Sequence, residues 1–332
     1  MGQDAGIGRQ VRGYLYRTAL ELMPASLALA LQFRRTQGRW PNLKRPRSFN
    51  EKLQWRKLHD RNPLLPFLID KIAVKELLAG HAGVDEWLIP TLWSGSRVST
   101  EILAGIAPPY VIKPNHASGR ILFNRGDFPD LAALAARANA MVAKPHPRFL
   151  QEWPYGQIGP RLLIEPFIGA DLAVPEDYKL YVFHGRVRFI QVDTDRERSH
   201  RRALYSREWR RMPFQYRINQ RAIPMPRPSQ LERMVAFAER IATDLALDFI
   251  RVDLYEVGGR TWVGELTPFP SSGFAKFDPP SADFEIGRFW RLPHHVQPVV
   301  RPHPVRVLAA VPPEGSDGDA RMRLHAGLRR RV

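Results

Sequence analysis

The stretch RVDLYEVGGRTWVGELT (residues 251–267) is the most informative part of the chain, because it predicts a hairpin with an acid on each arm. Two strand-like runs flank a Gly-Gly pair, which favours a tight turn. Asp253 and Glu265 lie among apolar neighbours on opposite arms. Strand side chains alternate between faces, so the loop length decides whether the acids meet. A two-residue loop pairs Asp253 with Gly264, whereas an odd-length or bulged loop puts both acids on one face.

Two carboxylates on one buried face repel each other unless a positive group lies between them. Mg²⁺ would satisfy Asp253 and Glu265, since it prefers carboxylate oxygens combined with substrate phosphates. Arg251 shares the face of Asp253 and would complement a phosphate. The alternative is that both acids pair with arginines of the surface. The hairpin therefore predicts either a metal site or a pair of ordinary salt bridges.

Two lysines on other predicted strands strengthen the metal hypothesis. Lys113 ends the apolar run YVIKPN, just before a polar loop that contains Gly, and such loops can point backbone N–H groups at phosphates. Lys179 lies in the middle of DYKLYVF, where a lysine is costly unless it is paired. Together with Arg251 and the two acids, these lysines indicate a nucleoside triphosphate site. The sequence has no Walker pattern and no dinucleotide-binding fingerprint.

Length and composition set broader limits. The 332 residues suffice for a large core and two lobes, and the absence of cysteine excludes disulfides and thiolate metal sites. We expect a reducing, cytoplasmic location. The formal charge of +17 favours an anionic partner, which could be nucleic acid, a membrane surface, a nucleotide or an acidic glycan.

The two ends of the chain are basic extensions. Residues 14–33 are apolar but contain Arg17, Glu21 and Pro24, so they are too interrupted for a confident membrane span. They predict a helix that either packs on the body or lies on an anionic membrane face. We find no secretory signal pattern at the N-terminus. Residues 294–332 are rich in Pro and Arg, and we predict that they are mostly disordered.

Periodicity and capping signals predict the elements between these extensions. We expect helices at 49–58, 70–81, 131–143 and 230–245, the first of them opened by a Ser48–Glu51 capping box. Strands are expected at 87–93, 110–115, 121–123 and 161–169, and a second hairpin at 177–193 turns at His184-Gly185.

The order of these pieces resembles the ATP-grasp superfamily, and within it the TupA-like (teichuronopeptide biosynthesis) family. The matching pieces are SFNEKLQWRKLHDRNPLLPFLIDKIAVKELL, LIPTLW, YVIKPNHASG, EWPYGQIGPRLLIEPFI, DYKLYVFHGRVRFIQVDTDR and IRVDLYEVGGRTWVGELTPFPSSGF, within residues 47–293. The resemblance implies an α+β fold in which two α+β subdomains hold ATP between them. We expect an N-terminal extension at 1–46, a helical region at 47–109, the smaller subdomain at 110–168, the larger one at 169–293, and the tail at 294–332.

The same resemblance assigns roles to individual residues. Lys113 would hold ATP phosphates under a loop that includes Asn115, Ser118 and Gly119. The hinge to adenine and ribose would be Glu165, Pro166, Phe167 and Ile168. Lys179 and Arg251 would act in catalysis, with Lys179 also contacting ATP, and Asp253, Glu265 and Thr267 would hold the metal. Thr267 stands where many relatives have Asn, and it is a neutral, weaker ligand.

The implied activity is an ATP- and Mg²⁺-dependent carboxylate–amine ligase that works through an acylphosphate, with Mn²⁺ as an alternative metal. Its partners would be small-molecule or glycan carboxylates and amines in surface-polysaccharide or peptide–uronate synthesis, with no specific nucleic acid. The location would be the cytoplasm or the inner membrane face. Arg196, His200 and Arg202 follow the second hairpin and predict either a lid for an anionic acceptor or a solvated loop. Two rival functions are an ATP-dependent sugar kinase or glycosyl-transferring enzyme, and a polyanion or nucleic-acid binding module.

Overall fold

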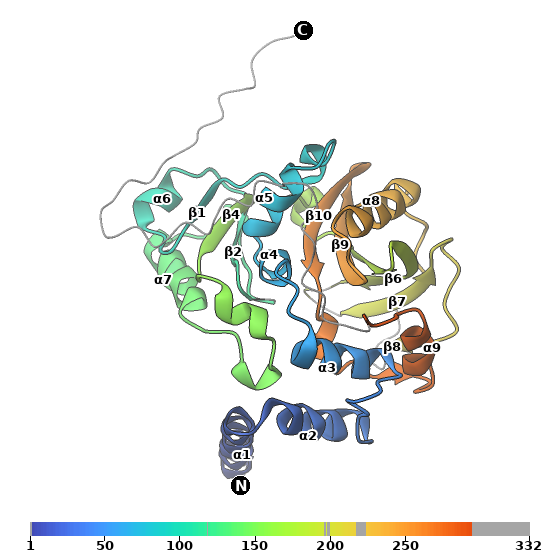
Figure 1. The fold of residues 1–332 in the computed structure, drawn as a ribbon. Coiled ribbons are helices and arrows are strands. Elements are labelled where there is room, and N and C mark those ends of the chain that lie inside the picture. The colour runs from blue at the N-terminus through green and yellow to red at the C-terminus, as the bar shows by residue number, and fades with distance from the viewer. Residues whose placement is uncertain (1, 118, 196, 198–199, 217–223, 294–332) are drawn as a thin grey trace.

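The computed structural model of the chain describes residues 2–117, 119–195, 197, 200–216 and 224–293 (Figure 1). Its helices are α1 (Gly2–Leu22), α2 (Ala25–Gln37), α3 (Phe49–His59), α4 (Leu65–Ile69), α5 (Ala73–Ala79), α6 (Thr100–Ala104), α7 (Leu131–Val142), α8 (Leu231–Asp244) and α9 (Ala282–Arg288). Its strands are β1 (Trp93–Gly95), β2 (Tyr110–Pro114), β3 (Leu122–Asn124), β4 (Leu162–Pro166), β5 (Asp177–Phe183), β6 (Arg186–Thr194), β7 (Arg201–Ser206), β8 (Gln215–Tyr216), β9 (Phe249–Val257), β10 (Arg260–Thr267) and β11 (Phe277–Asp278). Short 3-10 turns lie at Asp85–Trp87, Arg148–Leu150, Trp153–Gln157, Ala170–Leu172 and Pro270–Gly273.

The smaller lobe is a four-stranded antiparallel sheet in the order β1-β4-β2-β3. Helix α7 packs on it through Leu134 and Ala138, which meet Tyr110, Ile112 and Ile164 in one apolar cluster. The sheet includes β1, so it draws on residues before position 110. This arrangement leaves Lys113, near the end of β2, directed away from the fully buried core.

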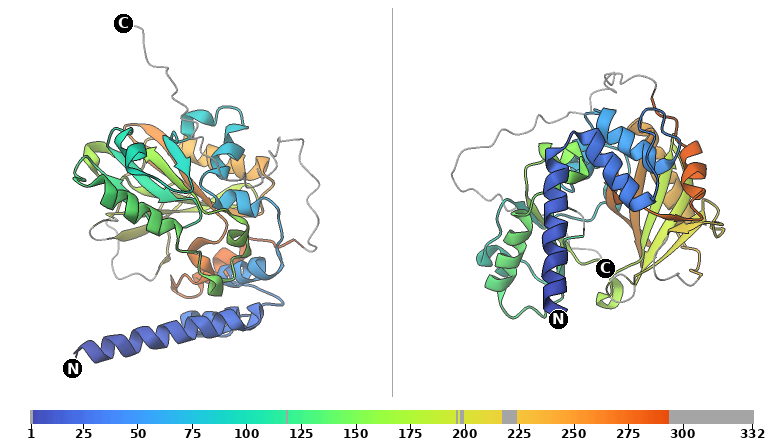
Figure 2. Two further views of the ribbon diagram at one scale, coloured as in Figure 1. Left: turned by 90° about the vertical axis from the view of Figure 1, so that its left-hand side faces the viewer. Right: turned by 90° about the horizontal axis from the view of Figure 1, so that it is seen from below.

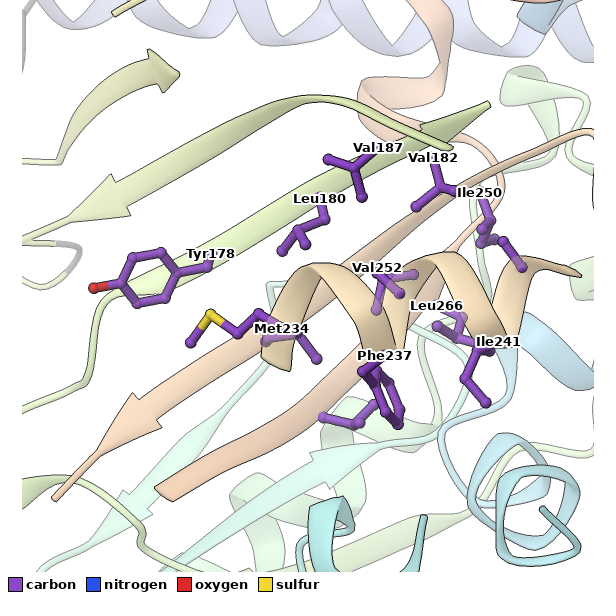
Figure 3. Close-up of a cluster of buried hydrophobic side chains, with 14 of the residues drawn as sticks. Tyr178, Leu180, Val182, Val187, Met234, Phe237, Ile241, Ile250, Val252 and Leu266 are labelled. Atoms are coloured by element: carbon purple, nitrogen blue, oxygen red, sulfur yellow. The ribbon is translucent and has the colours of Figure 1, made fainter. Parts of the chain in front are cut away.

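The larger lobe is a five-stranded antiparallel sheet in the order β10-β9-β5-β6-β7, and helix α8 covers one of its faces (Figure 3). Met234, Phe237 and Ile241 recur at helical spacing on α8 and are all buried. They meet Leu180 and Val252 of the sheet in a single core cluster. The predicted second hairpin is confirmed, because β5 pairs with β6 and the pairing of Phe183 with Arg186 leaves a two-residue turn.

The opposite face of the larger sheet packs on aromatic residues. Phe49 of α3 lies edge-on to Phe249 at 5.1 Å and near Tyr181 and Phe183, and Trp290 closes the same cluster. Helix α3 begins with the predicted capping box, in which Ser48 and Glu51 cap each other's backbone N–H groups. The cap and the aromatic face together fix α3 against the sheet.

Helices α1 and α2 lie together along one side of the two lobes (Figure 2). Helix α2 buries Ala28, Leu29 and Phe33, and Gln32 donates a hydrogen bond to the Phe149 carbonyl at 2.7 Å. The predicted helix over residues 14–33 is thus present but interrupted at Pro24. Within the described part of the chain, we find no helix with the length and apolar character needed to cross a bilayer.

Three expectations for local structure are corrected. The predicted strand at 87–93 is a 3-10 turn ending at Trp87, and the strand begins only at Trp93. The segment read as a linker after the second hairpin contains β7, which pairs with β6 through Thr194 and Phe189 at its ends. Helices α4 and α9 were not predicted, because each is too short to show periodicity. The tail at 294–332 lies outside the described residues.

Candidate active site

The two acids of the β9–β10 hairpin are direct cross-strand partners. Asp253 pairs with Glu265, and the register shifts between Val263 and Glu265, where Gly264 is the extra residue. The turn itself has two residues, since Val257 pairs with Arg260. The prediction that both acids share a face is confirmed, but the bulge lies at Gly264 within the strand and not in the turn. A regular ladder would have placed Gly264 opposite Asp253.

Arg251 binds this acidic pair from the same face. Its Nε and Nη2 donate to the two oxygens of Asp253 at 2.6 Å each, and Nη2 also donates to Glu265 at 2.9 Å. Thr267 accepts from Arg251 at 3.0 Å and donates to Glu265 at 2.8 Å. The guanidinium and the hydroxyl therefore fix both carboxylates, as expected for charge-assisted hydrogen bonds in a buried site.

Lys179 reaches the same site from the neighbouring strand β5. It lies opposite Asp253 in the register, and its ammonium donates to Asp253 at 2.9 Å and also to Asp177. Burial alone would lower the pKa of Lys179, but Asp177 and Asp253 raise it above its ordinary value. A lysine in mid-strand is thus accounted for by two carboxylates, and it stays charged.

A second group of cations faces the site from outside the larger sheet. Lys113 lies 2.5 Å from one oxygen of Glu165, and Lys75 pairs with the other oxygen. Lys71 donates to the Ala117 carbonyl at 2.6 Å, and burial lowers its pKa against the opposing effect of Glu265. Lys71 therefore lies near Glu265 on one side and near the Lys113–Glu165 pair on the other.

Lys71 and Lys75 escaped the sequence analysis. They lie four residues apart in DKIAVKELL, a spacing that puts them on one helical face and usually indicates a solvated stripe. The useful signal was the acid-lysine pair Asp70-Lys71 directly before α5. Asp70 caps this turn by accepting from the Ile72 amide at 2.8 Å, which holds Lys71 at the mouth of the site.

The two acids of the hairpin differ in their electrostatic surroundings. Burial raises the pKa of Asp253, against Arg251 and Lys179. Burial also opposes the charge of Glu265, but Lys71 and Arg251 hold its pKa well below the usual range. The Glu265 side chain is 26% exposed and that of Asp253 is 2% exposed. Glu265 is therefore the permanently charged carboxylate that faces the cleft.

The donor set fits a hard cation. Across the described ranges, no cluster of three or more His, Asp or Glu ligands is assembled. Two adjacent carboxylates with no nitrogen or sulfur donor suit Mg²⁺ or Mn²⁺, which commonly complete their coordination with phosphate oxygens and water. Thr267 offers a third oxygen beside them, already bonded to Glu265 and Arg251.

The loop after Lys113 differs from its expected role at one position. Asn115 is fully buried, donates to Asp70 at 2.9 Å and to the Gly159 carbonyl at 3.0 Å, and accepts from the Arg161 amide at 2.8 Å. The side-chain amide of Asn115 already has protein partners for its donors and its oxygen, so we do not propose it as a phosphate contact. Gly119 has a left-handed backbone and open space around it, whereas Ser118 lies outside the described residues.

The predicted hinge comprises the last two residues of strand β4 and the two residues after it. Pro166, Phe167 and Ile168 are half-buried, and the Phe167 amide donates to the Pro109 carbonyl at 3.1 Å. Glu165 itself points to the lysines and is buried, with a pKa that Lys113 and Lys75 lower against the effect of burial. The structure therefore places Glu165 as the counterion of two lysines, while the hinge role of Pro166–Ile168 stays a prediction.

Of the predicted acceptor-binding residues that the structure describes, Arg202 and His200 lie beside one carboxylate, that of Asp193. Arg202 donates to both oxygens of Asp193, at 2.5 and 3.0 Å, and His200 lies 3.4 Å from the same carboxylate. Burial disfavours the charged form of Asp193, but Arg202 lowers the pKa of this carboxyl group to about 2. Arg196 lies outside the described residues. The guanidinium of Arg202 is therefore bound to Asp193, and we do not propose Arg202 as a substrate ligand.

Comparison with known proteins identifies the family of the chain. The sequence pattern of the TupA-like ATPgrasp family matches residues 51–290, and the chain belongs to this family. The resemblance seen in the sequence is thereby confirmed. A comparison with curated proteins finds no match.

Solved structures of similar fold are ATP-grasp proteins and related ligases. D-alanine–D-alanine ligase from Bacillus anthracis is 15% identical, with 62% of this chain and 59% of that chain covered and a TM-score of 0.37. ATP-grasp ligase PsnB, solved with a minimal precursor, Mg and ADP, is 16% identical, with 66% and 57% covered and a TM-score of 0.37. D-cycloserine synthetase DcsG is 17% identical, with 68% and 70% covered and a TM-score of 0.37. The chain thus spans less than two thirds of the first two of these proteins.

Proposed function

We propose that the protein is an ATP- and Mg²⁺-dependent ligase that joins a carboxylate to an amine. The observation that carries this proposal is the cross-strand pair Asp253–Glu265, clamped by Arg251 and Lys179 and faced by Lys71 across the cleft. Membership of the TupA-like ATP-grasp family supports a nucleotide site at this place. Cations and paired acids arranged around one point are suited to transfer of a phosphoryl group.

Lys113 of β2 and Lys75 of α5 would bind the triphosphate. Lys113 and Lys75 share Glu165 as their counterion, so a phosphate entering the cleft would meet two ammonium groups already held in place. Lys71, buried beside Glu265, would contact the terminal phosphate of ATP, which is the group that is transferred. Bound Mg²⁺, held by Asp253 and Glu265, would neutralise charge on the phosphoryl oxygens.

Arg251 and Lys179 would stabilise the transferred group. A substrate carboxylate oxygen attacks the γ-phosphorus, the bond to the β,γ-bridging oxygen breaks, and ADP leaves. The resulting acylphosphate is then attacked at carbon by an amine, and phosphate departs with the C–O bond electrons. Both steps build charge on phosphoryl oxygens, which Arg251 meets with a fixed planar fork. Positioning and neutralisation therefore suffice, without a covalent nucleophile from the protein.

We further propose that the carboxylate belongs to a uronic acid or a related glycan of the bacterial cell envelope, as the sequence resemblance to the teichuronopeptide biosynthesis family implies. The N-terminal helices supply a reason to expect a membrane nearby. Tyr14, Leu15 and Leu22 expose 71%, 60% and 84% of their surface, with Arg12 and Arg17 on the same helix. Apolar and basic side chains on one helix suit an anionic membrane face.

The direct test is a product screen. Purified protein with ATP and Mg²⁺ is incubated with pairs of uronic acids and amino acids, and ADP release and product mass are measured. An amide product with one ADP per amide supports the ligase. A phosphorylated sugar that forms without any amine would identify a kinase and overturn the proposal.

A further inference from the structure

A pocket of about 210 Å³ opens beside the acids of the phosphoryl site, and Lys71 is part of its lining. Arg251, Glu265 and Thr267 form one wall, and His146, Glu152 and Tyr155 form another. The pocket has room for a small polar group next to the metal-bearing acids. None of His146, Glu152 and Tyr155 has a role in the phosphoryl transfer described above.

His146 and Glu152 form a dyad inside this pocket. The His146 Nε2 lies 2.8 Å from the Glu152 carboxylate, and the Glu152 side chain is only 5% exposed. The imidazole also lies flat on the Tyr155 ring, with centroids 3.6 Å apart and planes 2° from parallel. The Glu152 carboxylate and the Tyr155 ring together fix the orientation of the imidazole in the pocket.

The segment that carries the dyad is held from three directions. Gln32 of α2 donates to the Phe149 carbonyl at 2.7 Å, and Arg120 donates to the Lys144 carbonyl at 2.6 Å. Trp153 donates to the Asp60 carbonyl at 2.9 Å. Helix α2 thus braces the same short segment that positions His146. A fixed position is what a group that transfers protons requires.

The charges around the dyad suit a cation. Burial raises the pKa of the Tyr155 hydroxyl, and the nearby carboxylates of Glu152 and Glu265 raise it further. Lys71 and Arg251 lie on the phosphoryl side of the pocket, and Lys57 and His116 are the other titratable groups close by. The pocket offers an ammonium group two carboxylates, Glu152 and Glu265, in a lining that also contains Lys71 and Arg251.

We propose that this pocket receives the attacking amine, and that His146, positioned by Glu152, removes the proton that keeps the amine unreactive. The inference rests on the proposed ligase function. The ammonium R–NH₃⁺ gives one proton to His146 and becomes R–NH₂. Its lone pair forms the C–N bond to the acyl carbon, and the C–O bond to phosphate breaks. A second nitrogen proton leaves with the phosphate, and His146 later releases its own proton to water.

The test separates the two half-reactions. His146→Gln keeps a polar side chain of similar size but has no base, and His59→Gln changes an exposed histidine on α3 as the control. Acylphosphate formation is followed by exchange of ¹⁸O between the bridging and non-bridging positions of ATP, with the uronic acids of the screen above and no amine. Amide formation is followed by mass with the amino acids of that screen, or with hydroxylamine, which is largely unprotonated at neutral pH.

We expect His146→Gln to keep isotope exchange within about threefold of wild type and to lose amide formation by about 10²–10³-fold. Hydroxylamine should restore product to within about tenfold of wild type, because it needs no base. Glu152→Gln should show the same split with a smaller loss, and a pH–rate curve for amide formation displaced from that of wild type.

Three results would overturn the inference. Amide formation by His146→Gln at the wild-type rate would show that His146 is not the base. Equal loss of exchange and of amide, in a variant with wild-type circular dichroism, would give His146 a role in nucleotide binding only. A loss that hydroxylamine does not relieve would point to substrate placement. Wild-type protein that shows no exchange with any carboxylate would remove the ligase function itself, and this inference with it.

Discussion

Glu165→Gln should destabilise the free protein and strengthen its response to phosphates. The Glu165 carboxylate is buried and holds Lys113 at 2.5 Å and Lys75 on its other oxygen. Removing one partner of a buried ion pair costs about 3–5 kcal/mol, and the lower end applies because Lys75 keeps the Ile89 carbonyl at 2.7 Å. We therefore expect a loss of about 3 kcal/mol, or a fall in Tm of roughly 6–12 °C.

The same substitution discriminates between two roles for Glu165. As a counterion of lysines, its removal leaves two ammonium groups for which phosphate is the natural replacement. Inorganic tripolyphosphate should then raise the Tm of Glu165→Gln more than that of wild type. As a contact to adenine or ribose, its removal would instead reduce the stabilisation by ATP and leave the response to tripolyphosphate as in wild type.

The assay is thermal unfolding followed by circular dichroism, with and without tripolyphosphate. Glu101→Gln, an exposed acid on α6 of the same lobe, is the control and should change stability by less than about 0.5 kcal/mol. Adding Lys75→Met to Glu165→Gln should recover part of the loss, because it removes one uncompensated charge. A free protein within 0.5 kcal/mol of wild type, or a weaker response to tripolyphosphate, would refute the counterion reasoning.

Three further outcomes follow from the geometry. Gly273→Ala should lower the free energy of unfolding in urea by more than about 2 kcal/mol, since φ is +67° there and a Cβ would lie 2.3 Å from the Gln54 side chain. Gly83→Ala is the control: φ is +69° but the space is open, so the loss should be only about 1 kcal/mol. Arg202 holds the pKa of Asp193 down at about 2, against burial. This contribution is present above pH 4 and is lost as the pH falls through 2, so the stability gap between wild type and Asp193→Asn should narrow by about 2 kcal/mol on acidification; a constant gap would contradict the pairing. Leu22→Ser should reduce cosedimentation with anionic vesicles, and equal binding of both proteins would remove the helix from the membrane proposal.

The sequence predicted the wall of the site better than its details. Strand alternation put Arg251 and Asp253 on one face, and Lys179 was identified as a mid-strand lysine that needs a partner; the face of Glu265 depended on where an extra residue lies in the hairpin. The position of the bulge was not predictable, since both a Gly-Gly turn and a strand glycine can absorb an extra residue. In the structure the extra residue is Gly264, where a Cβ would come within 2.8 Å of the Tyr255 ring.

The cations of the opposite wall were harder to predict. Lys71 and Lys75 belong to a short helical segment, where a lysine is common and a functional lysine looks like any other. Only the tertiary fold brings them to Glu165 and Glu265. Arg202 shows the reverse error, because an arginine-rich run reads as a solvated or substrate-binding segment until its partner Asp193 on the neighbouring strand is known.

The dyad of His146 and Glu152 had no local signature. The two residues lie six positions apart in the sequence, and their side chains meet only because the chain between them forms a 3-10 turn at Arg148–Leu150. Its brace, Gln32, comes from a helix that the sequence assigned to a peripheral extension. Contacts of this kind depend on tertiary structure and leave no periodic trace in a single sequence.

Titration of ATP into the protein by calorimetry, with and without Mg²⁺, tests the central claim most directly. The account predicts that wild type binds ATP more tightly with Mg²⁺, and that folded Asp253→Asn loses this metal-dependent gain. Asp244→Asn, an exposed acid at the end of α8, should retain it. Metal-dependent binding by Asp253→Asn equal to that of wild type would contradict the assignment of the β9–β10 acids as the metal site.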